Sequence, residues 1–251
     1  MQNVVPLGDT MDQEIGVPAS VRSVERTLDL LLALERSGRP VGVSELSRAV
    51  GIPKATAQRL LGVLERRGFV QKEQARYQLG VGIVPLARAF LTGNSLTKAA
   101  LPILEELALV SGETASLFVR QGFDRVVVQR VNSPHPLRYS IRVGQRLPLH
   151  VGASGLVLAA AMPEAELQQL LDQLGEIRLA TGETLSKEML RQKIEQIRKQ
   201  GFAISQGERE IGVTSVAAPV VLPLRGTVAA IAVTGPPSRM TAEKVEYLVT
   251  E

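Results

Sequence analysis

The sequence predicts an α+β protein built from an N-terminal winged helix-turn-helix and a larger C-terminal α+β domain. Three observations support this prediction. Apolar residues recur at helical spacing in three segments between residues 20 and 67, and two short strand-like segments follow them. From residue 114 onward, strand-like segments are grouped on either side of helical ones. A chain of 251 residues with 45% hydrophobic residues is also long enough to bury a core in each domain.

The N-terminal part contains three predicted helices. The first begins at the N-cap Ser20 and is expected to place four apolar side chains on the core, namely Val21, Val24, Leu28 and Leu31. The second runs from Ser44 to Val50, and Gly51 turns the chain toward the third. Pro53 is expected in the first turn of the third helix, where its missing N–H costs nothing, and Gly68 ends that helix.

The third helix has one apolar and one polar face. At 100° per residue, one stripe is apolar and is expected to face the core: Ala57, Leu60, Leu61 and Leu64. On the opposite face, Arg59 can donate two hydrogen bonds to guanine, and Gln58 can donate one hydrogen bond to adenine and accept another from it. Each such pair is worth about 1–3 kcal/mol of discrimination between bases. Thr56 and the free N–H groups of the first turn suit a phosphate oxygen. Gly62 lets the backbone of this face approach a groove.

A basic hairpin is predicted after the third helix, with strands at 69–72 and 76–79. Taken alone, the polar helix face could be an ordinary solvated surface. A short helix, a glycine turn, a helix with a basic start and a basic hairpin are together specific for duplex DNA. The chain has no Trp and few Tyr and Phe, which argues against single-strand binding by aromatic stacking. The predicted DNA-contacting residues are Ser44, Lys54, Ala55, Thr56, Gln58, Arg59, Arg66, Lys72 and Arg76.

Charge and composition narrow the class of protein further. Residues 19–82 carry eleven Lys and Arg against six Asp and Glu, so the positive excess lies in the part predicted to bind DNA. Residues 1–18 lack the features of a secretory signal and are expected to form a disordered tail. The absence of cysteine excludes disulfides and thiolate metal sites. No apolar run reaches the roughly 20 residues that cross a membrane, so a soluble, cytoplasmic protein is expected.

A connecting helix is predicted from residue 83, because Ile83, Leu86, Ala87 and Phe90 keep helical spacing. Its apolar stripe suits either a contact between two protomers or packing on the C-terminal domain, and the residues do not decide between these. A second helix is expected from about Leu96 to Val110. The predicted organisation is therefore a tail at 1–18, a DNA-binding domain at 19–82, a linker helix at 83–98 and a C-terminal domain at 99–251.

The C-terminal domain alternates between strand and helix patterns. Strands are predicted at 114–121, 125–131, 137–145, 202–205, 215–222 and 227–234. Helices are predicted at 153–161, after Pro163, and at 186–200. Helices between groups of antiparallel strands are typical of an α+β sensor domain.

Five segments of the chain together carry a family resemblance: "SVERTLDLLLAL", "GIPKATAQRLLGVLERRGFV", "YQLG", "GQRLPLHVGASGLVLAA" and "GEREIGVTSVAAPV". In this order they resemble the isocitrate lyase regulator (IclR) family of bacterial transcription regulators, over about residues 20–251. The resemblance implies a homodimer or tetramer that binds double-stranded operator DNA through the winged helix. It also implies a GAF-like C-terminal domain that binds a small organic or aromatic acid as effector.

The resemblance further implies where the effector lies. A loop before a helix contributes Ala153 and Ser154, with Tyr139 on the preceding strand. The implied effector-binding residues are Tyr139, Ala153, Ser154, Ser205, Val213, Ser215, Ala232 and Thr234. Free N–H groups at a helix start attract a carboxylate, and neighbouring hydroxyls orient it. A simpler interpretation makes Ser154 an N-cap and Val213 a core residue.

The chain departs from the family pattern at several positions. Many relatives carry an acidic residue in place of Ser205, a cysteine in place of Ser215 and a lysine in place of Leu156. The identity of the ligand therefore does not carry over from a relative. A pocket with Val213 and Ala232 among hydroxyls is expected to take a partly apolar, weakly anionic effector. The sequence ends at "AEKVEYLVTE", where family members usually continue their last helix, which suggests a shortened C-terminus.

The residues argue against an enzyme. His135 and His150 are the only histidines, "GASGL" is not the G-x-S-x-G elbow, and neither a zinc-protease motif nor a phosphate-binding loop is present. No cofactor and no metal are expected. The alternative function is an architectural DNA-binding protein without a small-molecule ligand, which would leave the C-terminal part without a role.

Overall fold

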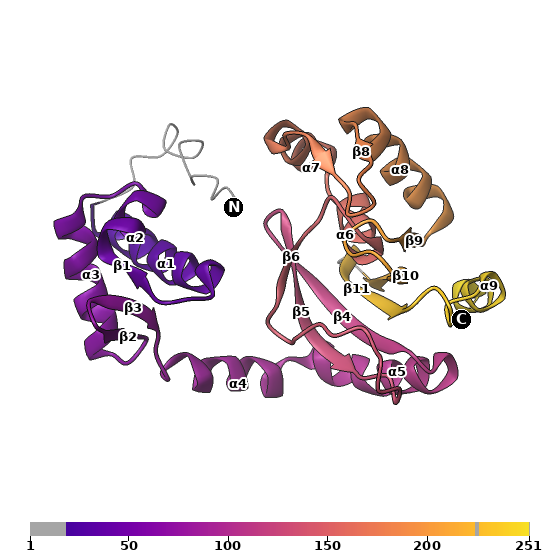
Figure 1. The fold of residues 1–251 in the computed structure, drawn as a ribbon, viewed down its shortest axis with the longest axis horizontal. Helices are drawn as coiled ribbons and strands as arrows, with labels where there is room; N and C mark the ends of the chain where they lie inside the picture. Colours follow the sequence, from indigo (N-terminus) through magenta and orange to yellow (C-terminus); the bar gives the residue numbers. More distant parts are fainter. Residues whose placement is uncertain (1–18, 224–225, 251) are drawn as a thin grey trace. The chain divides into compact units, whose positions relative to one another are not determined.

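The computed structural model describes residues 19–223 and 226–250. The chain divides into two compact units between Phe90 and Leu91, inside the segment 83–98 expected to be a linker. In Figure 1 the N-terminal unit is indigo to purple and the C-terminal unit magenta to yellow. The predicted tail, residues 1–18, lies outside the described residues.

The N-terminal unit is a winged helix-turn-helix, as predicted. Its elements are α1 (Ala19–Ser37), β1 (Val41–Gly42), α2 (Val43–Val50), α3 (Lys54–Arg66), β2 (Val70–Glu73) and β3 (Arg76–Leu79). The strands form an antiparallel sheet in the order β1-β3-β2. Gly51 ends α2 with a φ of 68°, a left-handed conformation that glycine adopts without steric cost. This turn brings α3 against α2 after only Ile52 and Pro53.

The side of α1 that faces the core differs from the prediction. Leu30 and Leu34 are buried, and Leu31 packs against the edge of the same core. Three predicted core residues are instead exposed, namely Val21, Val24 and Leu28. The segment "LDLLLAL" places leucine on nearly every side of the helix. Apolar spacing alone therefore could not identify the side that α2 and α3 cover.

Two predicted helix starts are also shifted. α1 begins at Ala19, so Ser20 lies within the helix and is not its N-cap. Pro53 is the N-cap of α3 and does not belong to its first turn, because its ψ of 139° is extended. The Pro53 carbonyl still accepts a hydrogen bond from the Ala57 N–H at 3.0 Å.

Two helices follow the winged unit. α4 (Ile83–Gly93) contains no buried residue, and Val84, Leu86 and Phe90 are exposed apolar side chains on it. α5 (Ser95–Ser111) is capped by Asn94, whose Oδ1 accepts hydrogen bonds from the N–H groups of Leu96 and Thr97. Of the apolar stripe predicted for the connecting helix, Leu86, Ala87 and Phe90 are exposed and Ile83 is half-buried.

The C-terminal unit contains an antiparallel sheet in the order β6-β5-β4-β11-β10-β9. Its larger elements are β4 (Thr114–Gln121), β5 (Asp124–Val131), β6 (Arg146–Pro148), α6 (Ala153–Ala160), α7 (Glu164–Gln173), α8 (Lys187–Gln200), β9 (Ala203–Gln206), β10 (Thr214–Leu222), β11 (Gly226–Gly235) and α9 (Ala242–Thr250). The small pair β7 (Ile177–Arg178) and β8 (Thr184–Leu185) was not predicted.

The strand predicted at 137–145 is absent from the described structure, and the short β6 takes its place. The segment meets β5 only at Val127, which donates to the Gln145 carbonyl at 3.0 Å and accepts from the Gly144 N–H at 2.7 Å. Residues 142–145 form a turn, because the Gln145 N–H donates to the Arg142 carbonyl at 2.9 Å, and the Gln145 side chain accepts from the Arg142 N–H at 3.1 Å. Tyr139 consequently lies on a loop and not on a strand.

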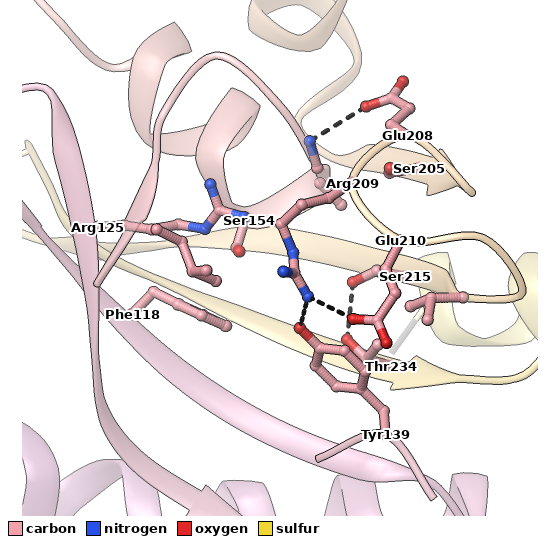
Figure 2. A pocket seen from close by; sticks show the side chains of 14 residues that line it. Phe118, Arg125, Tyr139, Ser154, Ser205, Glu208, Arg209, Glu210, Ser215 and Thr234 are labelled. Carbon is pink, nitrogen blue, oxygen red and sulfur yellow. Dashed lines mark hydrogen bonds and ion pairs between the residues drawn. The ribbon is translucent and has the colours of Figure 1, made fainter. Parts of the chain in front are cut away.

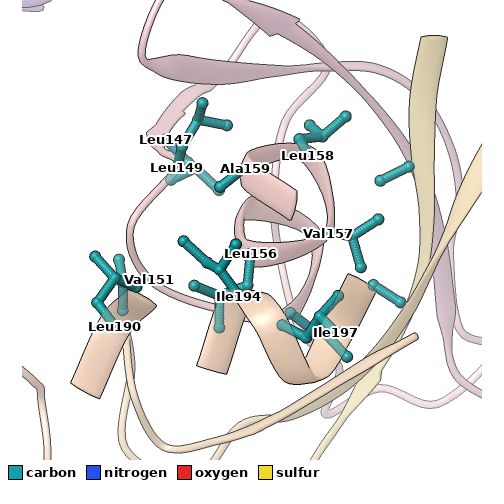
Figure 3. Packing of buried hydrophobic residues seen from close by; sticks show 14 of the residues in the cluster. Leu147, Leu149, Val151, Leu156, Val157, Leu158, Ala159, Leu190, Ile194 and Ile197 are labelled. Carbon is teal, nitrogen blue, oxygen red and sulfur yellow. The ribbon is translucent and has the colours of Figure 1, made fainter. Parts of the chain in front are cut away.

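The sheet is covered on both faces (Figure 1). α6 packs on one face and is itself covered by α8, whereas α5 contacts β4 and β5 on the other face. Figure 3 shows Leu156 of α6 packed among Leu190, Ile194 and Ile197 of α8. Residues 153–159 of α6 are all buried, so the helix is enclosed between the sheet and α8.

Candidate functional site

The surface of α3 has the two faces that the sequence predicts. The core-facing stripe is buried: Ala57, Leu60, Leu61 and Leu64. On the opposite face Thr56 is half-buried and the other predicted contacts are exposed, namely Lys54, Ala55, Gln58, Arg59 and Arg66. Within the described residues, Lys54, Arg59 and Arg66 have no ion-pair partner, so this face offers three uncompensated positive charges.

The wing places further positive charge beside α3. Lys72 and Arg76 are exposed on β2 and β3, and Ser44 is exposed at the start of α2. The Lys72 ammonium lies 5.5 Å from the centre of the buried Tyr77 ring, and Arg76 donates to the Pro40 carbonyl at 3.3 Å. These contacts hold the aliphatic parts of both side chains along the sheet, while the charged groups stay accessible to solvent.

A cavity of about 40 Å³ lies in the C-terminal unit, between the start of α6 and the strands β9, β10 and β11 (Figure 2). Seven of the eight implied effector-binding residues line it: Tyr139, Ala153, Ser154, Ser205, Val213, Ser215 and Thr234. Val213 is half-buried and faces this space, and the N-cap of α6 is Gly152 rather than Ser154. The simpler interpretations of Ser154 and Val213 are therefore wrong.

The floor of the cavity is a row of hydroxyls across the sheet. Ser205, Ser215, Thr234 and Thr114 stand directly opposite one another on β9, β10, β11 and β4. The hydroxyls of Ser215 and Thr234 are 2.9 Å apart. Thr114 is engaged elsewhere, because its hydroxyl donates to the Tyr139 carbonyl at 3.3 Å. The first three hydroxyls are thus the ones that face the cavity.

Ala232 is the implied residue that does not line the cavity. It is 1% exposed and lies in the core beneath α6. Two residues along each strand from the hydroxyl row, the sheet carries a row of small side chains: Ala203, Ala217, Ala232 and Ser116. Their size lets α6 approach the strands closely, which closes the cavity on that side.

The start of α6 already holds a carboxylate of the chain. The buried Glu208 accepts a hydrogen bond from the Gly152 N–H at 3.1 Å and forms an ion pair with Lys193 at 2.7 Å. Gly152 has a φ of 81°, a conformation that favours glycine. A negative charge is stabilised at this position because the helix dipole is positive at its N-terminus.

Arg125 is a buried cation beneath the same helix start. It is 3% exposed, and its Nη1 donates to the carbonyls of Pro148 and Val151, the latter at 2.9 Å. Its Nε has no hydrogen-bond partner among the described residues. Burial, and then the nearby Arg209, lower the pKa of Arg125 to about 9, so the guanidinium keeps its charge at neutral pH.

A glycine of the "GASGL" segment makes room for this guanidinium. A Cβ on Gly155 would lie 2.6 Å from the Leu149 carbonyl oxygen and would overlap Arg125. The glycine is therefore required by the close approach of Arg125 to α6, which explains its place in the segment without any catalytic role.

Arg209 lies on the loop between β9 and β10 and extends toward Tyr139 (Figure 2). Its Nη2 donates to the Tyr139 hydroxyl and to Glu210 Oε2, the latter at 3.0 Å. The guanidinium carbon lies 5.6 Å from the centre of the Tyr139 ring. Burial raises the pKa of Tyr139, so its hydroxyl stays protonated at neutral pH.

Sequence reasoning missed the charged residues of the cavity. Alternation along β5 could have indicated Arg125, because it shares a sheet face with the fully buried Val127. Glu208, Arg209 and Glu210 lie on a loop, where no periodicity predicts direction. The remaining lining residues that were missed are Phe118, Leu147 and Gly152.

Other kinds of site find little support in the described part of the chain. No group of three or more His, Asp or Glu side chains there could hold a metal ion. His150 is half-buried beside the cavity, and burial lowers its pKa. Among residues 19–223 and 226–250, no helix combines the length and apolar character that a membrane crossing requires.

Comparison with known proteins gives the same two parts. Residues 23–74 match the family model described as the IclR helix-turn-helix domain, and residues 88–251 match that of the bacterial transcriptional regulator IclR C-terminal domain. The HTH-type transcriptional repressor AllR of Salmonella typhimurium is 30% identical over 225 residues, which cover 89% of this chain and 83% of the relative. AllR of Escherichia coli K12 is 28% identical with the same coverage.

Solved structures show the same fold. A putative IclR regulator from Silicibacter sp. has a TM-score of 0.80 and 28% identity, with 91% of this chain and 90% of that chain covered. An IclR homolog from Microbacterium hydrocarbonoxydans, complexed with 4-hydroxybenzoate, has a TM-score of 0.70 and 23% identity, with 90% and 94% covered. With both of its domains matched in order, this chain belongs to the IclR family of bacterial transcriptional regulators and is not an enzyme.

Proposed function

We propose that this regulator binds a pseudo-palindromic operator as a homodimer or tetramer and that a small organic or aromatic acid controls its DNA affinity. Residues 19–82 would bind DNA, 83–98 would link, and 99–251 would bind the effector. The AllR relatives are named as repressors, which favours repression here. A DNA-binding transcription regulator of this composition is expected to work in the cytoplasm.

The DNA side of the proposal is supported by the exposed face of α3. Gln58 and Arg59 are adjacent in sequence on this face. The Gln58 amide can donate to and accept from an adenine edge, and the Arg59 guanidinium can donate twice to a guanine edge. Ser44, Lys54, Thr56, Arg66 and the wing residues would contact phosphates around them. Ala55 is small enough to sit against a thymine methyl.

The effector side is carried by one observation: a single cavity gathers three hydroxyls, a helix start and two guanidiniums. Hydroxyls and cations are the groups that bind and orient a carboxylate, and Phe118, Leu147 and Val213 add an apolar wall. The relative from Microbacterium hydrocarbonoxydans was solved with an aromatic acid, which agrees with this class of effector.

Control follows from linkage between the two sites. An effector that prefers one arrangement of the C-terminal domains in the oligomer changes the separation of the two α3 helices, and half-site spacing tolerates little error. A coupling of about 1–3 kcal/mol, the usual range for such control, would change operator affinity roughly 5- to 150-fold.

Selection of genomic fragments by the purified full-length protein tests the proposal. We expect enrichment of a few promoter fragments that share an inverted repeat, and a change in their retention when carboxylic acids are added. Sequence-independent retention at physiological ionic strength would refute operator recognition. Specific retention that no metabolite changes would favour the alternative, an architectural DNA-binding protein without a ligand.

A further inference from the structure

Arg209 extends across the cavity and limits its volume. Figure 2 shows its side chain between Ser154 at the start of α6 and Tyr139 on the opposite loop. The remaining space of about 40 Å³ accommodates only a few water molecules. Any organic acid that binds among the hydroxyls therefore has to displace the Arg209 guanidinium from Tyr139.

The charges around the cavity leave one positive charge without a counterion. Glu208 is neutralised by Lys193 at 2.7 Å, and Arg209 by Glu210 at 3.0 Å. Arg125 has no carboxylate within ion-pair distance among the described residues. Arg125 is deeply buried, and the nearby positive charge of Arg209 disfavours its charge further. An anion bound between the two guanidiniums would therefore be stabilised.

Glu210 is the side chain best placed to give way to a ligand. Glu210 forms one ion pair, with Arg209, and its own side chain is 56% exposed. A carboxylate this exposed loses little when its ion pair breaks, because water replaces its partner. Glu208 differs, since it is buried and hydrogen-bonded to the Gly152 N–H, so it would stay in place.

We propose that Arg209 is the residue that recognises the effector's carboxylate in this regulator, and that Glu210 competes with the effector for it. This rests on the proposed function, since it names the group of the effector site that selects its ligand. On binding, the ligand's carboxylate replaces Glu210 on the guanidinium, and Arg209 leaves Tyr139. The fixed charge of Arg125 adds to the attraction. The ligand class is a monocarboxylate whose apolar or aromatic body lies on Phe118, Leu147 and Val213.

Calorimetric titration of the full-length protein without DNA tests this assignment. The probes are benzoate and pyruvate, each compared with its neutral amide, benzamide or pyruvamide. We expect at least one acid to bind the natural protein about tenfold or more tightly than its amide, because charge-assisted hydrogen bonds are stronger than neutral ones. Arg209→Gln should abolish that preference. Glu210→Gln should strengthen acid binding by roughly three- to tenfold, because the competitor is gone.

Arg191→Gln is the matched control. Arg191 pairs with Glu164 on the outer helices α7 and α8 and does not line the cavity, so this variant should bind like the natural protein. The assignment is overturned if Arg209→Gln keeps the preference for acid, or if neither acid binds the natural protein better than its amide. An unchanged acid affinity in Glu210→Gln refutes the competition. Fragment selection tests DNA recognition separately, so each failure can be told apart.

Discussion

At the scale of single residues, Arg59 and Lys72 should separate base reading from phosphate binding. Arg59→Ala is expected to reduce preference at one base pair by about 1–3 kcal/mol, because a paired hydrogen bond to a base edge is lost. Lys72→Ala should weaken all duplexes alike and lower the slope of log affinity against log salt concentration by about one. Binding titrations on operator and random duplex over a salt series measure both. Equal, sequence-independent losses would contradict the assigned roles.

The pair formed by Glu113 and Arg239 should be important for stability. Glu113 is fully buried, and Arg239 donates to both of its oxygens at 2.5 and 2.9 Å. Arg239→Ala leaves the fully buried Glu113 carboxylate unpaired and should lower the free energy of unfolding of the C-terminal unit clearly more than the same change in an exposed ion pair does. Urea unfolding followed by fluorescence or circular dichroism measures the loss.

The exposed pair of Arg178 and Glu176, at 2.7 Å, provides the control. Arg178→Ala should cost less than about 1 kcal/mol, because water already solvates both charges. Equal effects of the two alanine variants would mean that burial of Glu113 does not matter.

His150 should make stability depend on pH. Burial, and then Arg125, lower its pKa from the ordinary value of 6.5, so the unfolded chain takes up the proton first as the pH falls. The stabilising contribution is fully present above about pH 6.5 and is lost as the pH falls through the folded-state pKa. His150→Gln should therefore lose less stability than the natural protein between about pH 7 and 5. If the free energy of unfolding of both proteins falls by the same amount over this pH range, the prediction is contradicted.

Half of the residues that line the cavity could be located from the sequence, through the family resemblance, because its hydroxyls and its helix start lie in recognisable segments. Its charges could not be located in the same way. The positions of Arg209 and Glu210 depend on the path of one loop, which no periodicity encodes. The burial of Arg125 depends on the close packing of α6 against the sheet, which Gly155 permits.

At the scale of elements, the turn of the wing is conformationally unfavourable. Gln74 and Ala75 both have positive φ angles, 44° and 64°, in a two-residue hairpin loop where Asn-Gly is preferred. The double change Gln74→Asn and Ala75→Gly should stabilise the hairpin by about 1 kcal/mol. Amide hydrogen exchange of β2 and β3 in the full chain measures the gain. Ala55→Gly should instead destabilise α3, because glycine is unfavourable inside a helix.

Element prediction succeeded where one signal governs the local structure. The hairpin of β4 and β5 follows from alternation and from the turn at Gly122, and both strands lie where the pattern places them. The segment 137–145 has strand-forming residues but pairs with β5 at one residue only. Pairing with a neighbour is a tertiary property, so strand propensity alone gave the wrong answer there. The prediction of the core-facing side of α1 was wrong for a related reason, because leucines occupy nearly all sides of this helix.

At the scale of the whole molecule, the spacing of the operator should matter more than any single contact. A dimer that reads two half-sites holds its α3 helices about one helical turn of DNA apart. Inserting about 5 base pairs between the half-sites moves them to opposite sides of the duplex, so affinity should fall to that of one half-site. Gel-shift titrations with a single half-site as control check this. Undiminished binding to the lengthened operator would indicate that the protein does not bind as a rigid pair.

The hydroxyl row and the alanine row across the sheet differ in how much change they should tolerate. The alanine row is held by the helix above it, so a bulkier side chain there would push α6 away from the strands. Within loop 207–213, Glu208 is buried and held by the Gly152 N–H. Arg209, Glu210 and Val213 line the cavity but do not belong to the row beneath α6, so they should tolerate exchange. Libraries that retune this regulator as a biosensor for a different metabolite should therefore randomise these three loop positions and leave the alanine row untouched.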